Sequence, residues 1–284
     1  MGRKTLQELT IMDDFMFGAV MMEPENCRLL LERILEIPID KVKVIREKSM
    51  IYHPEYKGIR MDVYAKDEKG TRFDVEVQIR KTPVERRSRY YHAQMDMESL
   101  QSGMEYEKLP DSYVIFICGY DPYGKDKYRY TVESRCLECP DIDCQDGLHT
   151  IILNNRGTNP EEIPKELVSF LEYTRKTIPE SEAEVEDDYI RRIQDSIRRI
   201  KDSREMGERY MTLQEMLKEE REEGRKEGRE EGLTEGRELE RMELMVRLVR
   251  EGGITEEKGA EILEISVEEF REKLGRHSEN RDVN

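Results

Sequence analysis

The chain has 284 residues, of which 39% are charged and 36% are hydrophobic, and its formal net charge is -16. This charge excludes a protein that coats nucleic acid by bulk attraction. It leaves room for a local basic groove, because salt confines each charge to roughly 8–10 Å. The length allows one sizeable core with appendages, or two small domains.

The sequence lacks several features that are typical of membrane and secreted proteins. No run of about 18 apolar residues occurs, so we expect no transmembrane helix and no membrane partner. The N-terminal stretch MGRKTLQELTIMDDF lacks the apolar segment of a signal peptide. Five cysteines, an odd number, fit a reduced protein better than a disulfide framework. We therefore expect a cytoplasmic protein.

The first part of the chain predicts helices followed by strands. The apolar spacing from Leu6 to about Pro38 is helical, and the proline ends it. The stretch KVKVIREKSM then predicts a strand. Residues 61–81, MDVYAKDEKGTRFDVEVQIRK, predict a β-hairpin that turns around DEKG with one bulged residue. A long helix is expected between Pro83 and Pro110.

The next segments complete an α/β core. SYVIFICGY is almost wholly apolar, which is typical of a strand buried on both faces. KYRYTVESRC and HTIILNN predict two further strands, and PKELVSFLEYT predicts a closing helix. The order of elements favours a mixed central sheet flanked by helices, within a domain that spans residues 1–176.

The composition changes after this domain. Residues 177–240 predict a charged helical connector that begins with a stripe of isoleucines: Ile190, Ile193, Ile197 and Ile200. Glycine then recurs every fourth residue, at Gly224, Gly228, Gly232 and Gly236. This period stacks arginine on arginine and glutamate on glutamate, which weakens a helix, as does each interior glycine. We expect a solvated connector; the alternative is a glycine stripe that lets two helices approach closely.

The C-terminal part predicts a small helical module at 241–276 and a disordered tail at 277–284. Ser266 and Glu269 form a capping box for its last helix. The module resembles a helix-turn-helix, but its would-be recognition helix SVEEFREKL is acidic and would repel phosphates. We therefore expect it to dock a partner or to associate with itself, as in a homodimer.

Acidic side chains gather on one face of the predicted hairpin. Asp62 is expected across from Glu76, and Gln78 shares their face. Carboxylates that face each other across a strand pair destabilise it unless a cation lies between them, and Mg²⁺ binds through one or two carboxylates. The pattern predicts a metal site, with a solvated sheet face as the alternative. Asp74, nearer the turn, is expected to be solvated.

A basic and aromatic helix follows this acidic strand. The residues expected to contact DNA are Lys81, Arg86, Arg87, Arg89, Tyr90, Tyr91 and Gln94. Carboxylates that hold an ion beside arginines that hold phosphates are what a nuclease needs. Ion pairs with Glu85 and Glu98 are the alternative for some of these arginines.

Several stretches together resemble the Rpn family of recombination-promoting nucleases, in the PD-(D/E)XK superfamily, whose members are often labelled transposases. They are TIMDDFMFGAVM, GIRMDVYAKDEKGTRFDVEVQ, RRSRYYHAQMD, YVIFICGYDPYG and the glycine-repeat tail. The resemblance covers residues 5–175 closely. It implies a restriction-endonuclease-like core and a DNA endonuclease of recombination or mobile-element biology, which hydrolyses phosphodiesters with Mg²⁺, or with Mn²⁺ in its place.

The resemblance also assigns roles to residues. Asp62 and Glu76 would be the catalytic metal ligands, and Gln78 stands where the superfamily typically has lysine. Asp14 matches an acidic position that assists the metal, with Asp13 as the neighbouring alternative. Glutamine can position a water but brings no charge, so we expect slow activity. The rival interpretation is a catalytically degenerate nuclease fold that acts through its helical C-terminal tail.

A second ligand set occurs between the later strands. Cys136, Cys139, Cys144 and His149 are spaced C-x2-C-x4-C-x4-H, and four such ligands could bind zinc tetrahedrally. We favour the alternative, an ordinary acidic turn.

Overall fold

The computed structural model describes residues 4–50, 59–142, 144–176, 178–181, 183 and 185–279. The chain divides into two compact units, Met1–Tyr210 and Met211–Asn284, called here the first unit and the C-terminal unit. The first unit contains the sheet, and the C-terminal unit is helical.

In the described part of the chain, six strands form one sheet in the order β1-β2-β3-β4-β6-β5. They are β1 (Val42–Met50), β2 (Ile59–Asp67), β3 (Arg72–Gln78), β4 (Ser112–Cys118), β5 (Arg129–Val132) and β6 (Leu148–Asn154). β3, β4 and β6 are parallel, whereas β1 with β2, β2 with β3, and β5 with β6 pair antiparallel. The predicted mixed sheet is confirmed.

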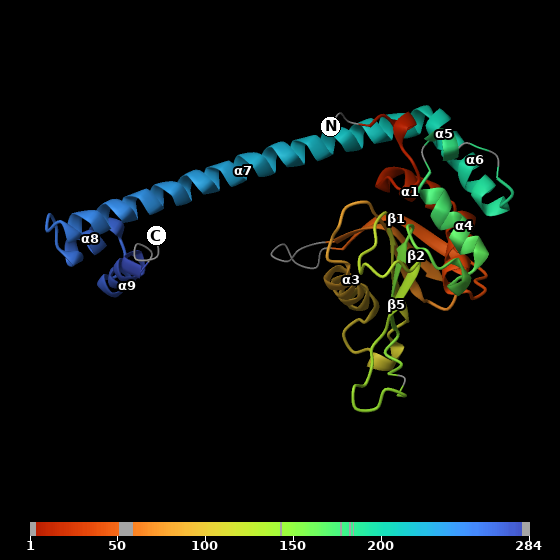
Figure 1. The fold of residues 1–284 in the computed structure, drawn as a ribbon, viewed down its shortest axis with the longest axis horizontal. Coiled ribbons are helices and arrows are strands. Elements are labelled where there is room, and N and C mark those ends of the chain that lie inside the picture. Colours follow the sequence, from red (N-terminus) through yellow and green to blue (C-terminus); the bar gives the residue numbers. More distant parts are fainter. Residues whose placement is uncertain are drawn as a thin grey trace. The chain divides into compact units, whose positions relative to one another are not determined.

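Helices flank this sheet. The first unit contains α1 (Asp14–Met21), α2 (Pro24–Leu35), α3 (Val84–Ser99), α4 (Lys165–Thr174), α5 (Ile178–Ser181), α6 (Asp188–Asp202) and the start of α7 (Arg204–Arg250). Short 3-10 turns cover Leu6–Glu8, Tyr106–Lys108 and Pro160–Glu162. Figure 1 shows α3 and α4 on opposite sides of the sheet, while α1 contacts β1, β2 and β3.

Two predicted helices differ from the observed ones. The helical pattern of the N-terminal region is two helices, because Pro24 starts a new helix at its N-terminus. The helix after Pro83 ends at Ser99 rather than near Pro110. Gly103, with φ of +86°, then takes the chain through a turn that a continuing helix could not make.

The hairpin that carries the acidic residues has the predicted turn. Asp67 N–H donates to the carbonyl of Thr71 at 3.2 Å, and Gly70 takes a φ of +90°. The pairing of β2 with β3 runs from Lys66–Arg72 to Val63–Val75, whereas β2 continues alongside β1 as far as Ile59. The ladder between β2 and β3 therefore ends just before Asp62.

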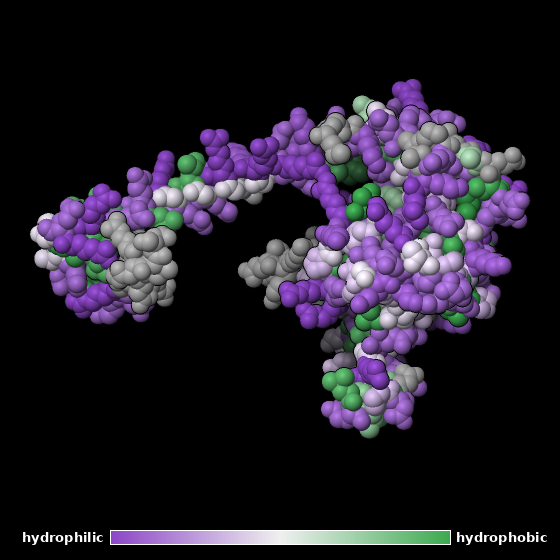
Figure 2. All heavy atoms as spheres, viewed as in Figure 1, coloured by the Kyte–Doolittle hydropathy of each residue, from purple (hydrophilic) through white to green (hydrophobic). Residues whose placement is uncertain are grey.

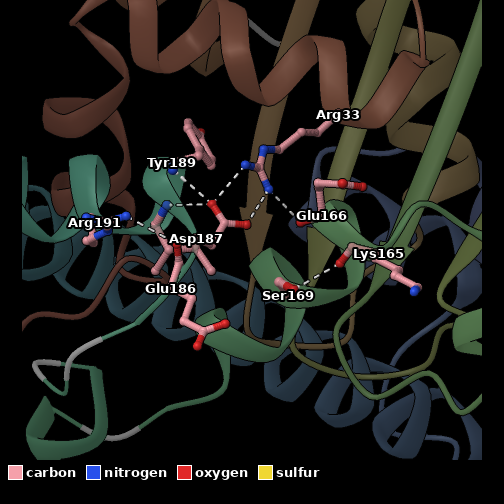
Figure 3. A network of polar contacts seen from close by, with 9 residues as sticks. Arg33, Lys165, Glu166, Ser169, Glu186, Asp187, Tyr189 and Arg191 are labelled. Atoms are coloured by element: carbon pink, nitrogen blue, oxygen red, sulfur yellow. Dashed lines mark hydrogen bonds and ion pairs between the residues drawn. The ribbon is translucent and has the colours of Figure 1, made fainter.

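α6 packs with the first unit, although the sequence placed it in the connector. Its isoleucines Ile190, Ile193 and Ile197 are buried, and it contacts α1 and α2. Figure 3 shows how its N-terminus is held: Arg33 of α2 pairs with both carboxylate oxygens of Asp187 at 2.8 Å. The same carboxylate accepts hydrogen bonds from the first backbone N–H groups of α6 and so caps the helix.

The glycine repeat lies within a continuous helix. α7 spans 47 residues, and the side chains described between 219 and 241 are all exposed. Its surface is mostly hydrophilic in Figure 2. The sequence pattern predicts at most a weak helix here, so the continuous helix differs from the prediction. The exposure of its side chains agrees with the predicted solvated connector. No helix among the described residues is both long and apolar enough to cross a membrane.

The C-terminal unit packs around one aromatic side chain. Phe270 of α9 (Val267–Glu279) is fully buried against Met245 and Val246 of α7 and Ala260 of α8 (Glu256–Leu263). Ser266 Oγ accepts from Glu269 N–H at 3.1 Å, as the capping box predicts. Residues 277–279 continue α9, and the rest of the tail expected to be disordered, 280–284, lies outside the described residues.

Candidate active site

The candidate site lies where β2 separates from β3. Beyond the last paired residue, the backbone N–H of Asp62 donates to Glu76 Oε1 at 3.1 Å. Glu76 is 2% exposed, and the parallel register places it beside Phe116 of β4 on the face that α3 covers. Asp62 is half-buried. The structure therefore places the Glu76 carboxylate against the main chain of Asp62, the residue that the sequence paired with it.

Gln78 lies on the same strand face, at the edge of the site. Its Nε2 is 3.5 Å from Glu76 Oε2, and its Oε1 accepts from the hydroxyl of Thr82 at 3.3 Å. The loop before α3 therefore orients this amide. The predicted catalytic trio of Asp62, Glu76 and Gln78 is thus contiguous.

Arg87 of α3 contacts the buried carboxylate directly. Its Nη2 lies 2.7 Å from Glu76 Oε2 and donates to the hydroxyl of Tyr91 at 2.6 Å. Its guanidinium also lies 5.2 Å from the ring centroid of Tyr91 and 5.4 Å from that of Phe116. A cation in contact with two rings and a carboxylate has a well-defined position.

The pKa values of both carboxylates are raised, chiefly by burial. Burial raises the pKa of Asp62, and the negative charges of Glu76 and Asp14 raise it further. Burial also raises the pKa of Glu76, although Arg87 opposes this shift. Both shifts show negative charge held close together in a desolvated place, which a bound cation would relieve.

Asp74 departs from the sequence prediction. It was expected to be solvated, but its side chain is fully buried on the face of β3 that carries Glu76. Within the described part of the chain, neither of its carboxylate oxygens has a hydrogen-bond partner. Burial raises its pKa well above the usual value, with Glu76 and Asp62 adding to the shift. The strict alternation of β3, together with the helix predicted to follow, was the signal for this burial.

The two N-terminal aspartates occupy different environments. Asp13 accepts from the backbone and hydroxyl of Thr10 at 2.8 and 3.1 Å, and Lys4 pairs with it at 2.6 Å. Asp14 instead has an exposed side chain whose charge acts on both Asp62 and Glu76. Of the two aspartates, Asp14 is therefore the one whose charge acts on the site.

The residues expected to contact DNA fall into two groups. Lys81, Arg86 and Arg89 are exposed, and Tyr90 is half-buried against the core beneath α3. Tyr91 and Gln94 are each 7% exposed and face the sheet together with Arg87. Their inward position suits the support of α3 and Arg87 better than contact with a DNA backbone.

The sequence of the chain matches the model of a known protein family. The model of one family, described as PD-(D/E)XK nuclease family transposase, matches residues 11–224, which is most of the chain. The chain belongs to this family. The matched range contains the whole sheet and every residue of the candidate site. No curated protein and no solved structure matches the chain significantly.

Nucleases of this family usually depend on a divalent metal, so the fit of the residues to such an ion matters. Among the described residues, no group of three or more His, Cys, Asp or Glu side chains is already arranged to hold one. The donor chemistry nevertheless fits. The unpartnered oxygens of Asp74 and the repulsion between Asp62 and Glu76 show an excess of hard oxygen donors over cations.

The cysteine-rich segment does not form such a group either. Cys136 contacts Glu138 through its Sγ at 3.7 Å, and His149 stacks on Tyr113 with ring centroids 4.4 Å apart. Cys139 and Cys144 are exposed. Within the residues that the structure describes, these side chains form no metal-binding arrangement.

Proposed function

We propose that this chain is a metal-dependent DNA endonuclease that hydrolyses phosphodiester bonds in recombination or mobile-element biology. The observation that carries the proposal is the pair Asp62 and Glu76 at the opening between β2 and β3, with Arg87 in contact with Glu76. Membership of a nuclease-related family supports the same conclusion. A reduced, cytoplasmic setting is part of the proposal.

Each group of residues has its own role in the proposed reaction. Asp62 and Glu76, assisted by Asp14, would hold a Mg²⁺ ion, with Mn²⁺ as a substitute. Such an ion supplies Lewis-acid stabilisation and lowers the pKa of a bound water. Gln78, held by Thr82, orients the attacking water through its amide. The exposed cations Lys81, Arg86 and Arg89 bind phosphates on either side of the cleaved bond.

Cleavage of both strands of a duplex needs two such sites. We therefore include in the proposal a homodimer that forms through the C-terminal helices. Size-exclusion chromatography with light scattering tests this: a dimeric full chain that becomes monomeric when residues 211–284 are removed is expected. An unchanged mass per particle in the shortened chain would contradict it.

Plasmid nicking tests the activity. The full chain is incubated with supercoiled plasmid and Mg²⁺, and compared with Asp62→Asn, Glu76→Gln and the exposed control Asp141→Asn. We expect the wild type and the control to nick the plasmid at the same rate, and the two site variants to lose at least about 100-fold. Equal nicking by all four proteins, or none by the wild type, would contradict the proposal.

The rival function is a non-catalytic nuclease fold that serves as a scaffold. The observation that favours it is the ion pair between Arg87 and Glu76, which already satisfies one oxygen of a proposed metal ligand. A scaffold of this kind has no need to bind a divalent ion at Asp62 and Glu76. Metal titration therefore separates the two functions.

A further inference from the structure

The side chain at position 78 leaves the site without a positive charge from β3. The amide of Gln78 approaches Glu76 only at 3.5 Å and carries no charge. Phosphodiester hydrolysis develops negative charge on the phosphate oxygens in its transition state, and a fixed cation there lowers the barrier. A fixed side-chain cation at the phosphate, in addition to a metal ion, would therefore have to come from another element of the fold.

Arg87 on α3 holds the position from which that charge can act. It contacts the same carboxylate oxygen, Glu76 Oε2, that Gln78 approaches, and does so at 2.7 Å. The side chain of Arg87 is 27% exposed, whereas that of Glu76 is 3% exposed. The guanidinium thus reaches from the buried carboxylate toward the surface, where a phosphate would arrive.

Its orientation is fixed by groups that are not needed for metal binding. The ring of Tyr91 and the ring of Phe116 both lie against the guanidinium, and the hydroxyl of Tyr91 accepts from its Nη2. Only one of the two terminal nitrogens is used in these contacts. A guanidinium has five N–H donors, so several remain to bind phosphate oxygens.

We propose that Arg87 supplies, from helix α3, the positive charge at the scissile phosphate that a lysine at position 78 would otherwise supply. The inference rests on the proposed nuclease function. In the reaction, a water oxygen forms a bond to phosphorus, and the bond from phosphorus to one ester oxygen breaks. The water gives its proton to solvent, and the leaving oxygen takes one from solvent. Arg87 keeps its protons throughout and donates hydrogen bonds to the phosphate oxygens.

The test uses the full chain with Mg²⁺ and supercoiled plasmid, under single-turnover conditions. The variants are Arg87→Ala, Arg87→Gln and the double variant Gln78→Lys with Arg87→Ala. The control is Arg198→Ala, an exposed arginine of α6. DNA affinity is measured separately by fluorescence anisotropy without metal. Far-UV circular dichroism checks that each variant folds, and Arg87→Gln serves where Arg87→Ala does not.

We expect Arg87→Ala to nick about 100-fold more slowly while its DNA affinity without metal changes less than about threefold. The double variant should regain at least about tenfold of the lost rate, because the lysine restores a cation beside Glu76. Arg198→Ala should match the wild type in both measurements.

Three results would overturn the inference while the wild type is active. The first is an Arg87→Ala rate within about threefold of the wild type, and the second is a DNA affinity that falls in parallel with the rate. The third is a folded double variant that regains nothing. An inactive wild type would instead remove the proposed function, so the two failures are distinguishable.

Discussion

Asp74 is the residue whose replacement the structure predicts most sharply. Its carboxylate is fully buried, has no hydrogen-bond partner among the described residues, and lies near the charges of Glu76 and Asp62. An unsatisfied buried polar group costs about 1–3 kcal/mol. Asp74→Asn has nearly the same shape, cannot ionise, and offers two N–H donors to the neighbouring carboxylates. We expect it to stabilise the metal-free first unit by about 2 kcal/mol.

Tyrosine fluorescence reports this change in the first unit alone. The chain has no tryptophan, and all 14 tyrosines lie at or before Tyr210. In EDTA, the thermal midpoint of Asp74→Asn should rise by about 4–8 °C, because about 1 kcal/mol shifts a unit of this size by 2–4 °C. Asp141→Asn, at an exposed site, should leave the midpoint unchanged. A lower midpoint for Asp74→Asn would show that the carboxylate is stabilised in the native fold and would refute the reasoning.

Three further predictions follow from other parts of the molecule. Arg33→Ala removes both contacts with Asp187 and should lower the free energy of unfolding by about 2–3 kcal/mol in urea, whereas the exposed Arg191→Ala should change it by less than about 0.5 kcal/mol. Burial lowers the pKa of His92 to about 4, so protonation of this residue at low pH favours the unfolded chain. Between pH 6.5 and pH 4 the free energy of unfolding of the wild type should fall by up to about 3 kcal/mol more than that of His92→Gln. Parallel curves of unfolding free energy against pH would contradict this. An added Cβ at Gly228 or Gly232 meets no atom within 4 Å, so alanine at each should stabilise the helix by about 1 kcal/mol. The ellipticity of α7 and its melting temperature should both rise; a lower helix signal would mean that the glycines make contacts.

The sequence predicted the elements that its periodicity marks clearly. The alternation in β3 and the uninterrupted apolar run of β4 gave both strands within a residue or two, because a strand buried on one face or both must show that pattern. The hairpin register followed from the same alternation and from the turn at Gly70. It placed Asp62 across from Glu76, which is why the central pair of the site could be predicted.

The contacts made by long side chains could not be predicted in the same way. Burial of Asp74 depends on α3 lying over its strand face, which is a tertiary arrangement that alternation alone does not specify. The pairing of Arg87 with Glu76 depends on the angle between α3 and the sheet, so Arg87 was assigned to DNA rather than to the carboxylate. The helix of the glycine repeat likewise contradicts local propensity, which is a weak guide over so charged a stretch.

Calorimetric titration of the metal-free full chain with Mn²⁺ tests the central claim most directly, because it needs neither DNA nor turnover. We expect the wild type to bind one ion, and both Asp62→Asn and Glu76→Gln to weaken that binding by more than about tenfold, while the exposed control Asp141→Asn binds as the wild type does. No binding by the wild type, or equal binding by all four proteins, would show that these two carboxylates do not share a divalent ion.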